Sequence, residues 1–299
     1  MDTKLFVRKQ PGGLFAIIDR GVFPSGDIWW VNSDGGTDSA GNGKNPDSPF
    51  DSLEYAAETA ASAGDTIYVM AGHTETITTL TLAKAGLTII GLGGRTRKPQ
   101  ILVDAEASHV TITAADTVIE NLTFLAGFLD VTKCINVAAA GVEIRGCNFE
   151  ENTTNENFLI AILTTAAGDD LTIEGNLITT IDAQATEGIE IVGACNRVII
   201  KDNYIKGPYS VSAISATTVA CLDMQIIGNR IINTLAGNDL AGCIDLVAAS
   251  TGIMAHNDCY MEDDTDILTA IDAGNLGRVR NLVANEYGQE AHNSAEMSA

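Results

Sequence analysis

Short apolar segments of this chain are interrupted, at one recurring position, by a polar residue. The segments LTIEGNLITT, VIIKDNYIKG and MQIIGNRIIN each place an asparagine where a strand calls for another hydrophobic side chain. The segments share a six-residue pattern: an apolar residue, any residue, a small or polar residue, a position X, any residue, and an apolar residue. When the segments are aligned on this pattern, the X positions are spaced 25, 29, 27, 26, 28 and 28 residues apart. They are Leu122, Cys147, Asn176, Asn203, Asn229, Asn257 and Asn285. This spacing indicates an internal repeat.

A second series of positions runs in step with the first. An isoleucine followed two residues later by an apolar or small residue recurs at spacings of 25, 29, 25, 30 and 27 residues. Its members are Ile135, Ile160, Ile189, Ile214, Ile244 and Ile271. Because two independent markers share one period, the repeat is not an accident of a single alignment.

The content of each repeat predicts the fold. Two or three short alternating β segments are joined by Gly, Asn, Asp and Thr, with no helical pattern between them. The leucines of a leucine-rich repeat are missing at their fixed offsets. We therefore expect an all-β chain, a single-stranded right-handed parallel β-helix of about 8–9 coils of about 27 residues each.

The recurring asparagines have a structural interpretation in this fold. Stacked coil on coil, each amide can donate to and accept from the next, which satisfies an inward polar group. Asparagine also tolerates the left-handed backbone of a sharp corner, and we expect each one to occupy such a corner. The predicted ladder comprises Asn176, Asn203, Asn229, Asn257 and Asn285.

Several motifs resemble one family. The asparagine ladder resembles that of the pectate-lyase-like β-helix superfamily, and the segment WWVNSDGGTDSAGNGKNPDSPFDSLEYAAETAASAGDTIYVMAGHTETI is similar to the N-terminal region of that superfamily. The resemblance covers roughly residues 28–288. It implies the β-helix fold but no single activity, since enzymes and inert viral proteins share this architecture.

The pattern divides the chain into three parts. Residues 1–26 form an N-terminal arm with Phe6, Phe15 and Phe23, which we expect to dock either on the first coil or on another chain. Residues 27–288 form the β-helix. Within them, Asp51 and Glu54 suggest a capping box for a helix over about residues 52–62 that covers the open first coil. Residues 289–299 form a polar, mobile C-terminal tail.

Composition and charge narrow the function. The 299 residues carry a formal net charge of −22, which opposes binding to nucleic acid and to anionic membranes. The six cysteines show neither a CxxC pair nor metal-ligand spacing with the four histidines, so we expect buried free thiols, no metal and no cofactor. The N-terminal residues carry no signal-peptide pattern, which suggests synthesis and folding in a host cytoplasm.

Catalytic candidates are few. The isoleucine series implies an outward column of Asn136, Ala161, Glu190, Ser215, Asp245 and Asp272. Asp245 and Asp272 would lie about one coil apart, a separation compatible with a glycosidase pair, and Glu190 is a weaker candidate. Against catalysis, the column holds no basic residue, whereas the resemblance to pectate lyases would imply a basic residue and bound Ca²⁺. Of the polygalacturonase motifs only Asp169–Asp170 is present, and we expect it in a turn.

Outward positions before the asparagines are unusually apolar. We expect Ile199, Ile227, Ile253, Ala255 and Val283 to form one patch. A contiguous apolar patch on a protein surface is typically an interface. Since β-helix chains in viral particles are commonly trimers, the resemblance implies a homotrimer assembled through this patch.

These observations favour a non-enzymatic structural protein of a tailed-phage virion. The segments KQPGGLF and DTIYVMAGHTETI also look like those of β-helix proteins encoded in phage structural-gene clusters. We expect a capsid decoration protein or surface spike that binds itself and the major capsid protein or another virion protein. The alternative is a polysaccharide lyase or glycoside hydrolase, a depolymerase on the same fold.

Overall fold

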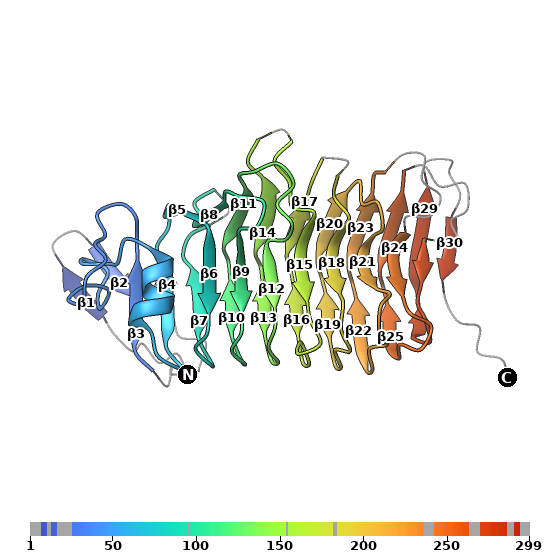
Figure 1. The fold of residues 1–299 in the computed structure, drawn as a ribbon, viewed down its shortest axis with the longest axis horizontal. Coiled ribbons are helices and arrows are strands. Elements are labelled where there is room, and N and C mark those ends of the chain that lie inside the picture. Colours follow the sequence, from blue (N-terminus) through green and yellow to red (C-terminus); the bar gives the residue numbers. More distant parts are fainter. Residues whose placement is uncertain are drawn as a thin grey trace.

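The structure is a computed structural model that describes residues 7–10, 13–16, 26–94, 96–153, 155–181, 184–235, 242–262, 270–285 and 290–293. The chain winds into a long stack of parallel strands, with the coils following one another from the N-terminal to the C-terminal end (Figure 1). It is a right-handed parallel β-helix, as the repeat predicts.

Three parallel sheets form the walls of the stack. Sheet 1 contains β3 (Ile28–Val31), β4 (Thr66–Val69), β7 (Thr88–Gly91), β10 (Val118–Glu120), β13 (Glu143–Arg145), β16 (Thr172–Glu174), β19 (Ile199–Lys201), β22 (Met224–Ile227), β25 (Gly252–Ala255) and β28 (Gly277–Val279). Sheet 2 contains β5 (Thr74–Ile77), β8 (Gln100–Val103), β11 (Thr123–Ala126), β14 (Asn148–Glu151), β17 (Leu177–Thr179), β20 (Tyr204–Gly207), β23 (Arg230–Asn233), β26 (Asp258–Met261), β29 (Asn281–Asn285) and β30 (Glu290–Asn293). Sheet 3 contains β6 (Thr79–Leu82), β9 (His109–Ile112), β12 (Ile135–Val137), β15 (Ile160–Thr164), β18 (Glu187–Ile191), β21 (Ser212–Ala216), β24 (Gly242–Leu246) and β27 (Ile271–Asp272).

The number of coils is slightly lower than expected. The eight strands of sheet 3 bound seven full turns, against the predicted 8–9 coils. The difference arises at the two ends, where sheets 1 and 2 each hold ten strands and continue beyond sheet 3.

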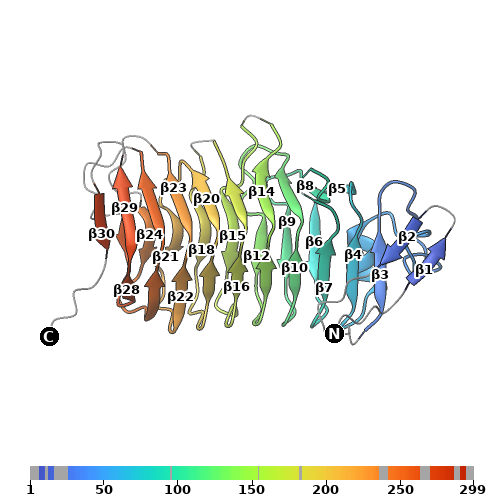
Figure 2. The same ribbon diagram turned by 180° about the vertical axis from the view of Figure 1, so that it is seen from behind.

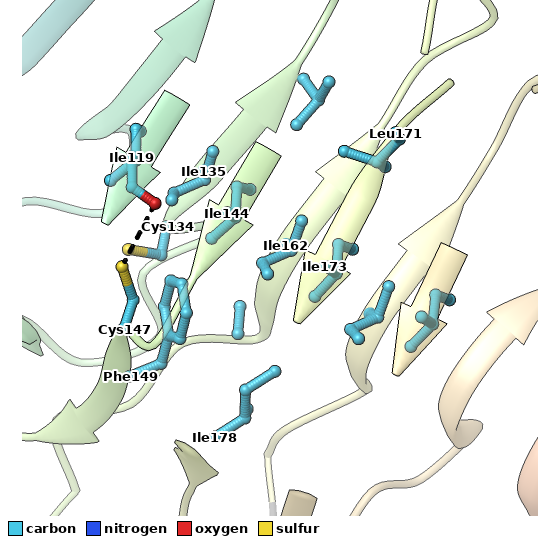
Figure 3. Packing of buried hydrophobic residues seen from close by; sticks show 14 of the residues in the cluster. Ile119, Cys134, Ile135, Ile144, Cys147, Phe149, Ile162, Leu171, Ile173 and Ile178 are labelled. Atoms are coloured by element: carbon cyan, nitrogen blue, oxygen red, sulfur yellow. Dashed lines mark hydrogen bonds between the residues drawn. The ribbon is translucent and has the colours of Figure 1, made fainter. Parts of the chain in front are cut away.

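Columns of aliphatic side chains fill the stack. On sheet 1, Ile119, Ile144 and Ile173 occupy the same register position on successive strands and are buried. Figure 3 shows them facing side chains of the other two sheets, among them Ile162 and Phe149. Such a column suits Ile and Val, because β-branched side chains pack well on a pleated surface.

The cysteines belong to this core. All six are free and buried, which confirms that prediction. The Cys147 thiol lies 3.9 Å from the carbonyl oxygen of Ile119, and burial raises the pKa of this thiol to about 11 (Figure 3). At neutral pH the thiol is therefore protonated and unreactive.

One short helix covers the first coil. It is the π-helical segment η1 (Tyr55–Ala60), preceded by a helical turn at residues 53–54, so it is shorter than the predicted 52–62. It ends early because Ala61 donates its N–H to the Ala56 carbonyl over five residues and then adopts an extended backbone. Leu53, Ala56 and Ala57 are buried, as expected of a cap.

The two ends of the chain carry additional strands. Near the N-terminus, β1 (Val7–Gln10) and β2 (Gly13–Ala16) form an antiparallel hairpin that includes Phe15, whereas Phe6 and Phe23 lie outside the described residues. At the other end, β30 pairs antiparallel with β29 (Figure 2). Part of the predicted mobile tail therefore forms a strand, since an unpaired final strand would expose its backbone.

Candidate functional site

The corners of the stack differ in length, and this decides where side chains can gather. From β10 onward, sheets 1 and 2 are joined by one or two residues, whereas the connections into and out of sheet 3 are longer. Long connections can carry functional groups, and short corners must be built from residues with special backbone geometry.

The asparagine ladder lines the short corner. The Asn203 side-chain amide donates to the Ile173 carbonyl and to Oδ1 of Asn229, both at 3.0 Å. Its own Oδ1 accepts from the backbone N–H and from Nδ2 of Asn176, at 2.9 and 3.0 Å. The same contacts recur at Asn229 and Asn257. The ladder is therefore structural, as the sequence predicts.

The left-handed corner residue is not the asparagine itself. The residue immediately before each ladder position has positive φ, for example Gly175 at 64°, Asp202 at 55° and Gly228 at 68°. The prediction that asparagine occupies this conformation was wrong: the preceding residue makes the turn, and the asparagine then points inward to bond the neighbouring coils.

The last rung of the ladder lies four residues before its predicted place. Asn257 donates to Oδ1 of Asn281, at 2.9 Å from Nδ2, so Asn281 and not Asn285 completes the ladder. Residues that pair across the last coil, such as Ala255 and Val279, are only 24 residues apart, and a fixed spacing of about 27 residues passes over this shorter coil. Asn285 is buried at the end of β29 instead.

The same shift alters the predicted apolar patch. Ile199, Ile227 and Ile253 do face outward from sheet 1, and Ile253 is 40% exposed. Ala255 occupies the outward column but is 5% exposed, and Val283 belongs to the core at 1%. The outward residue on the last strand of this column is Val279, which is 42% exposed.

The acidic column lies on the outward side of sheet 3. Glu190, Ser215, Asp245 and Asp272 occupy one register position on β18, β21, β24 and β27. The residue before Glu190 in this column is Leu163, not the predicted Ala161, because Ile162 rather than Ile160 points inward. Asp245 and Asp272 are thus on adjacent strands, which lie about 4.8 Å apart.

Burial raises the pKa of two carboxyls in this column, and repulsion adds to the effect at one of them. Burial raises the pKa of Asp245, and the Asp272 carboxylate raises it further. Burial likewise raises the pKa of Glu190. Asp245 is half-buried and Asp272 is exposed, so the two carboxyls of the pair lie in different surroundings.

A second acidic group escaped the sequence analysis. Glu187 begins β18 and is buried, and desolvation, opposed by a hydrogen bond from Thr186, raises its pKa. It lines a small cavity between sheets 2 and 3, with room for about one water molecule, together with the buried Tyr209. The Tyr209 hydroxyl has no hydrogen-bond partner in the described part of the chain. No sequence signal separates this tyrosine from an ordinary core residue.

A buried histidine and a carboxylate hold the helical cap. The Glu75 carboxylate accepts from the N–H groups of Leu53 and Glu54, at 2.6 and 3.1 Å, and contacts His73 Nε2 at 3.1 Å. His73 Nδ1 accepts from the Ser33 N–H at 3.0 Å. Ser33, His73 and Glu75 are the residue types of a hydrolase triad, but the serine contributes its backbone to the histidine. Ser33, His73 and Glu75 therefore hold the N-terminal turn of the helical cap in place.

The remaining motif has a structural role. Asp169–Asp170 lies in a turn, as predicted, and Asp170 has φ of 57°. Arg197 on the next coil donates two hydrogen bonds to the Asp170 carboxylate, at 2.6 and 2.7 Å. The aspartate pair is therefore a staple between coils.

Two classes of site can be assessed over the described ranges. These residues include no group of three His, Cys, Asp or Glu side chains that could hold a metal ion. No helix in the described part of the chain is long and apolar enough to cross a membrane.

Comparisons with known proteins agree on the fold. No protein-family model and no curated protein matches the chain. Among solved structures, Escherichia coli YbhC matches with a TM-score of 0.56 at 12% identity, covering 92% of this chain and 89% of that one. A pectin methylesterase from Aspergillus niger matches with a TM-score of 0.53 at 14% identity, covering 94% and 93%. A rhamnogalacturonan lyase matches at 0.49 and 11%, covering 91% of each chain. The chain thus shares the parallel β-helix fold with YbhC and the pectin methylesterase.

Proposed function

We propose that this protein is a structural component of a virus particle, a capsid decoration protein or surface spike, and that it acts by assembly. The observation that carries the proposal is the outward face of sheet 1. Apolar side chains stand there on a rigid surface, in a chain whose net charge of −22 favours an acidic exterior. A patch of this kind on a rigid sheet is typical of a protein interface.

The location in a virion is supported by sequence likeness. The segments KQPGGLF and DTIYVMAGHTETI look like those of phage-encoded β-helix proteins. The second segment builds β4, β5 and the His73–Glu75 cap support, so it serves the fold. The major capsid protein or another virion protein is the expected partner besides a second copy.

The test is the protein inventory of purified particles of a virus that encodes this sequence. Mass spectrometry should detect the chain at many copies per particle, and mild dissociation should release it in folded form. Its absence from intact, infectious particles would refute the proposal.

A second candidate is a carbohydrate-active enzyme, a lyase or hydrolase. It is favoured by the Asp245–Asp272 pair, whose strand spacing suits a retaining glycosidase. The named fold neighbours include a pectin methylesterase and no viral protein, so the comparisons lend this candidate more support than the virion role. At 14% identity, however, the likeness to the esterase concerns the fold.

Activity assays separate the two candidates. We expect no turnover of pectin, alginate or bacterial capsular polysaccharide, followed through reducing ends and through absorbance of unsaturated products. Turnover that disappears in Asp245→Asn with Asp272→Asn, but persists in the control Asp258→Asn on sheet 2, would establish the enzyme instead.

A further inference from the structure

The outward face of sheet 1 carries two columns of side chains with a symmetrical pattern. Sheet 1 has ten strands, so its centre lies between β13 and β16. The column nearer the short corner reads, from β7 to β22, Ile90, Glu120, Arg145, Glu174, Lys201 and Ile227. Apolar residues thus stand on both sides of a charged band of alternating sign.

The column read from β7 to β22 is complementary to the same column read from β22 to β7. If a second copy lies on this face with its axis antiparallel and the sheet centres aligned, β13 meets β16, β10 meets β19 and β7 meets β22. Arg145 then faces Glu174, Glu120 faces Lys201, and Ile90 faces Ile227. Each contact occurs twice, as a twofold axis requires.

The second column is compatible with the same arrangement. There Val118 faces Ile199, Thr88 faces Gln225 and Glu143 faces Thr172. Over these six strands neither column brings two like charges together, and this favours the arrangement since like charges opposed across an interface cost several kcal/mol.

The physical setting of the face also suits a partner. A shallow polar hollow runs beside the corner, between Glu120, Arg145 and Glu174. The charged groups are held in place within the chain: Arg145 pairs with Glu143, and Lys201 Nζ lies 3.0 Å from Glu174 Oε1. Prearranged charges cost less side-chain entropy on binding. Sheet 3, by contrast, presents Glu190, Asp245 and Asp272 without a basic residue in their column.

We infer that sheet 1 is the docking surface for a second copy of this chain, in an antiparallel twofold dimer centred between β13 and β16. The inference deepens the proposed assembly function and rests on it. It replaces the threefold contact that likeness to viral β-helices implies, because the face of sheet 1 matches its own reverse.

Cysteine cross-linking tests the arrangement directly. The native thiols are all buried, so introduced surface cysteines can be oxidised selectively. Val118→Cys combined with Ile199→Cys should give a covalent dimer under mild oxidation, whereas either single variant should not. Failure of the double variant to cross-link, or cross-linking by Ile199→Cys alone, would overturn the antiparallel register.

Sedimentation tests the surface. The wild type should be a dimer at tens of micromolar, and Ile227→Asp should weaken the dimer at least tenfold while circular dichroism still reports β structure. Ile232→Asp on sheet 2 is the matched control and should remain a dimer. A monomeric or trimeric wild type, or equal dissociation of both variants, would refute the inference.

A charge exchange excludes an effect through folding. Lys201→Glu places like charges opposite Glu120 and should weaken the dimer. Adding Glu120→Lys should restore it, although each new charge then lies beside a like charge in its own chain. Failure of restoration counts against the contact. A protein that is monomeric in solution yet abundant in virions would sink this inference and leave the virion role intact.

Discussion

Replacing Asn203 by leucine tests the ladder at an internal rung. The amide of Asn203 makes four hydrogen bonds, two as donor and two as acceptor. Leucine has similar volume but no polar atoms, so the change removes these bonds with little change in packing. Position 203 keeps its backbone N–H bond to Asn229, at 3.0 Å.

The cost is calculated from the groups that lose their partners. Asn176 is left with two buried donors, its backbone N–H and one Nδ2 hydrogen, which lose the Asn203 acceptor. A buried unsatisfied donor costs about 1–3 kcal/mol, and burial of the leucine recovers about 1.5–3 kcal/mol. The expected net loss in the free energy of unfolding is about 1–3 kcal/mol.

Urea unfolding followed by circular dichroism measures the loss, and hydrogen exchange locates it. The Asn176 amide should exchange faster in Asn203→Leu, whereas amides of the first coils should not. Asn275→Leu is the control, since Asn275 is exposed and its side chain is outside the ladder. An unchanged urea midpoint together with unchanged exchange at Asn176 would refute the reasoning.

Two further predictions concern the cap and the acidic pair. Glu75→Ala should destabilise the first coil by about 1–3 kcal/mol, because the Leu53 and Glu54 N–H groups lose their acceptor, and hydrogen exchange at residues 53–57 should report it. Unchanged protection there would contradict this role for Glu75. Asp245 has a raised pKa in the folded state, so its contribution to stability is complete below the unfolded pKa and is lost as pH rises through the folded one. Asp245→Asn should therefore melt at a higher temperature than the wild type at pH 7, and the difference should vanish near about pH 3.5, below the ordinary aspartate pKa. A constant difference across this range would contradict the raised pKa that burial and the Asp272 carboxylate give Asp245.

The fold could be predicted because the sequence repeats with a regular period and because apolar and polar residues alternate within each short strand. The residues that mark each coil, such as Asn203 and Ile189, sit in buried columns where every coil repeats the same demand. Two errors of register arose. The last coil is short, with Ala255 paired to Val279 only 24 residues later, and this moved the ladder from Asn285 to Asn281. In β15 the inward isoleucine is two residues later than predicted, at Ile162 instead of Ile160.

The sites were less accessible to sequence reasoning than the fold. Asp245 and Asp272 could be paired from the sequence because each comes directly after a residue of the isoleucine series, Ile244 and Ile271. Tyr209 lies in the irregular connection between β20 and β21, where no periodic rule relates sequence distance to spatial distance, and it meets Glu187, the first residue of β18, at one cavity. The His73–Glu75 support of the cap is likewise unpredictable, because its partners at residues 33 and 53 belong to an unrepeated segment.

The ladder end offers the sharpest comparison between the repeat rule and the hydrogen bonds. If Asn281 completes the ladder, Asn281→Leu leaves two donors of Asn257 without an acceptor, its backbone N–H and one Nδ2 hydrogen. Asn203→Leu leaves the same two donor types of Asn176 without an acceptor. Both variants should then lose about 1–3 kcal/mol. Asn285→Leu leaves both Asn257 donors paired, so hydrogen exchange at the Asn257 amide should stay at the wild-type rate. Faster exchange there in Asn285→Leu but not in Asn281→Leu would return the last rung to the position that the sequence period assigns.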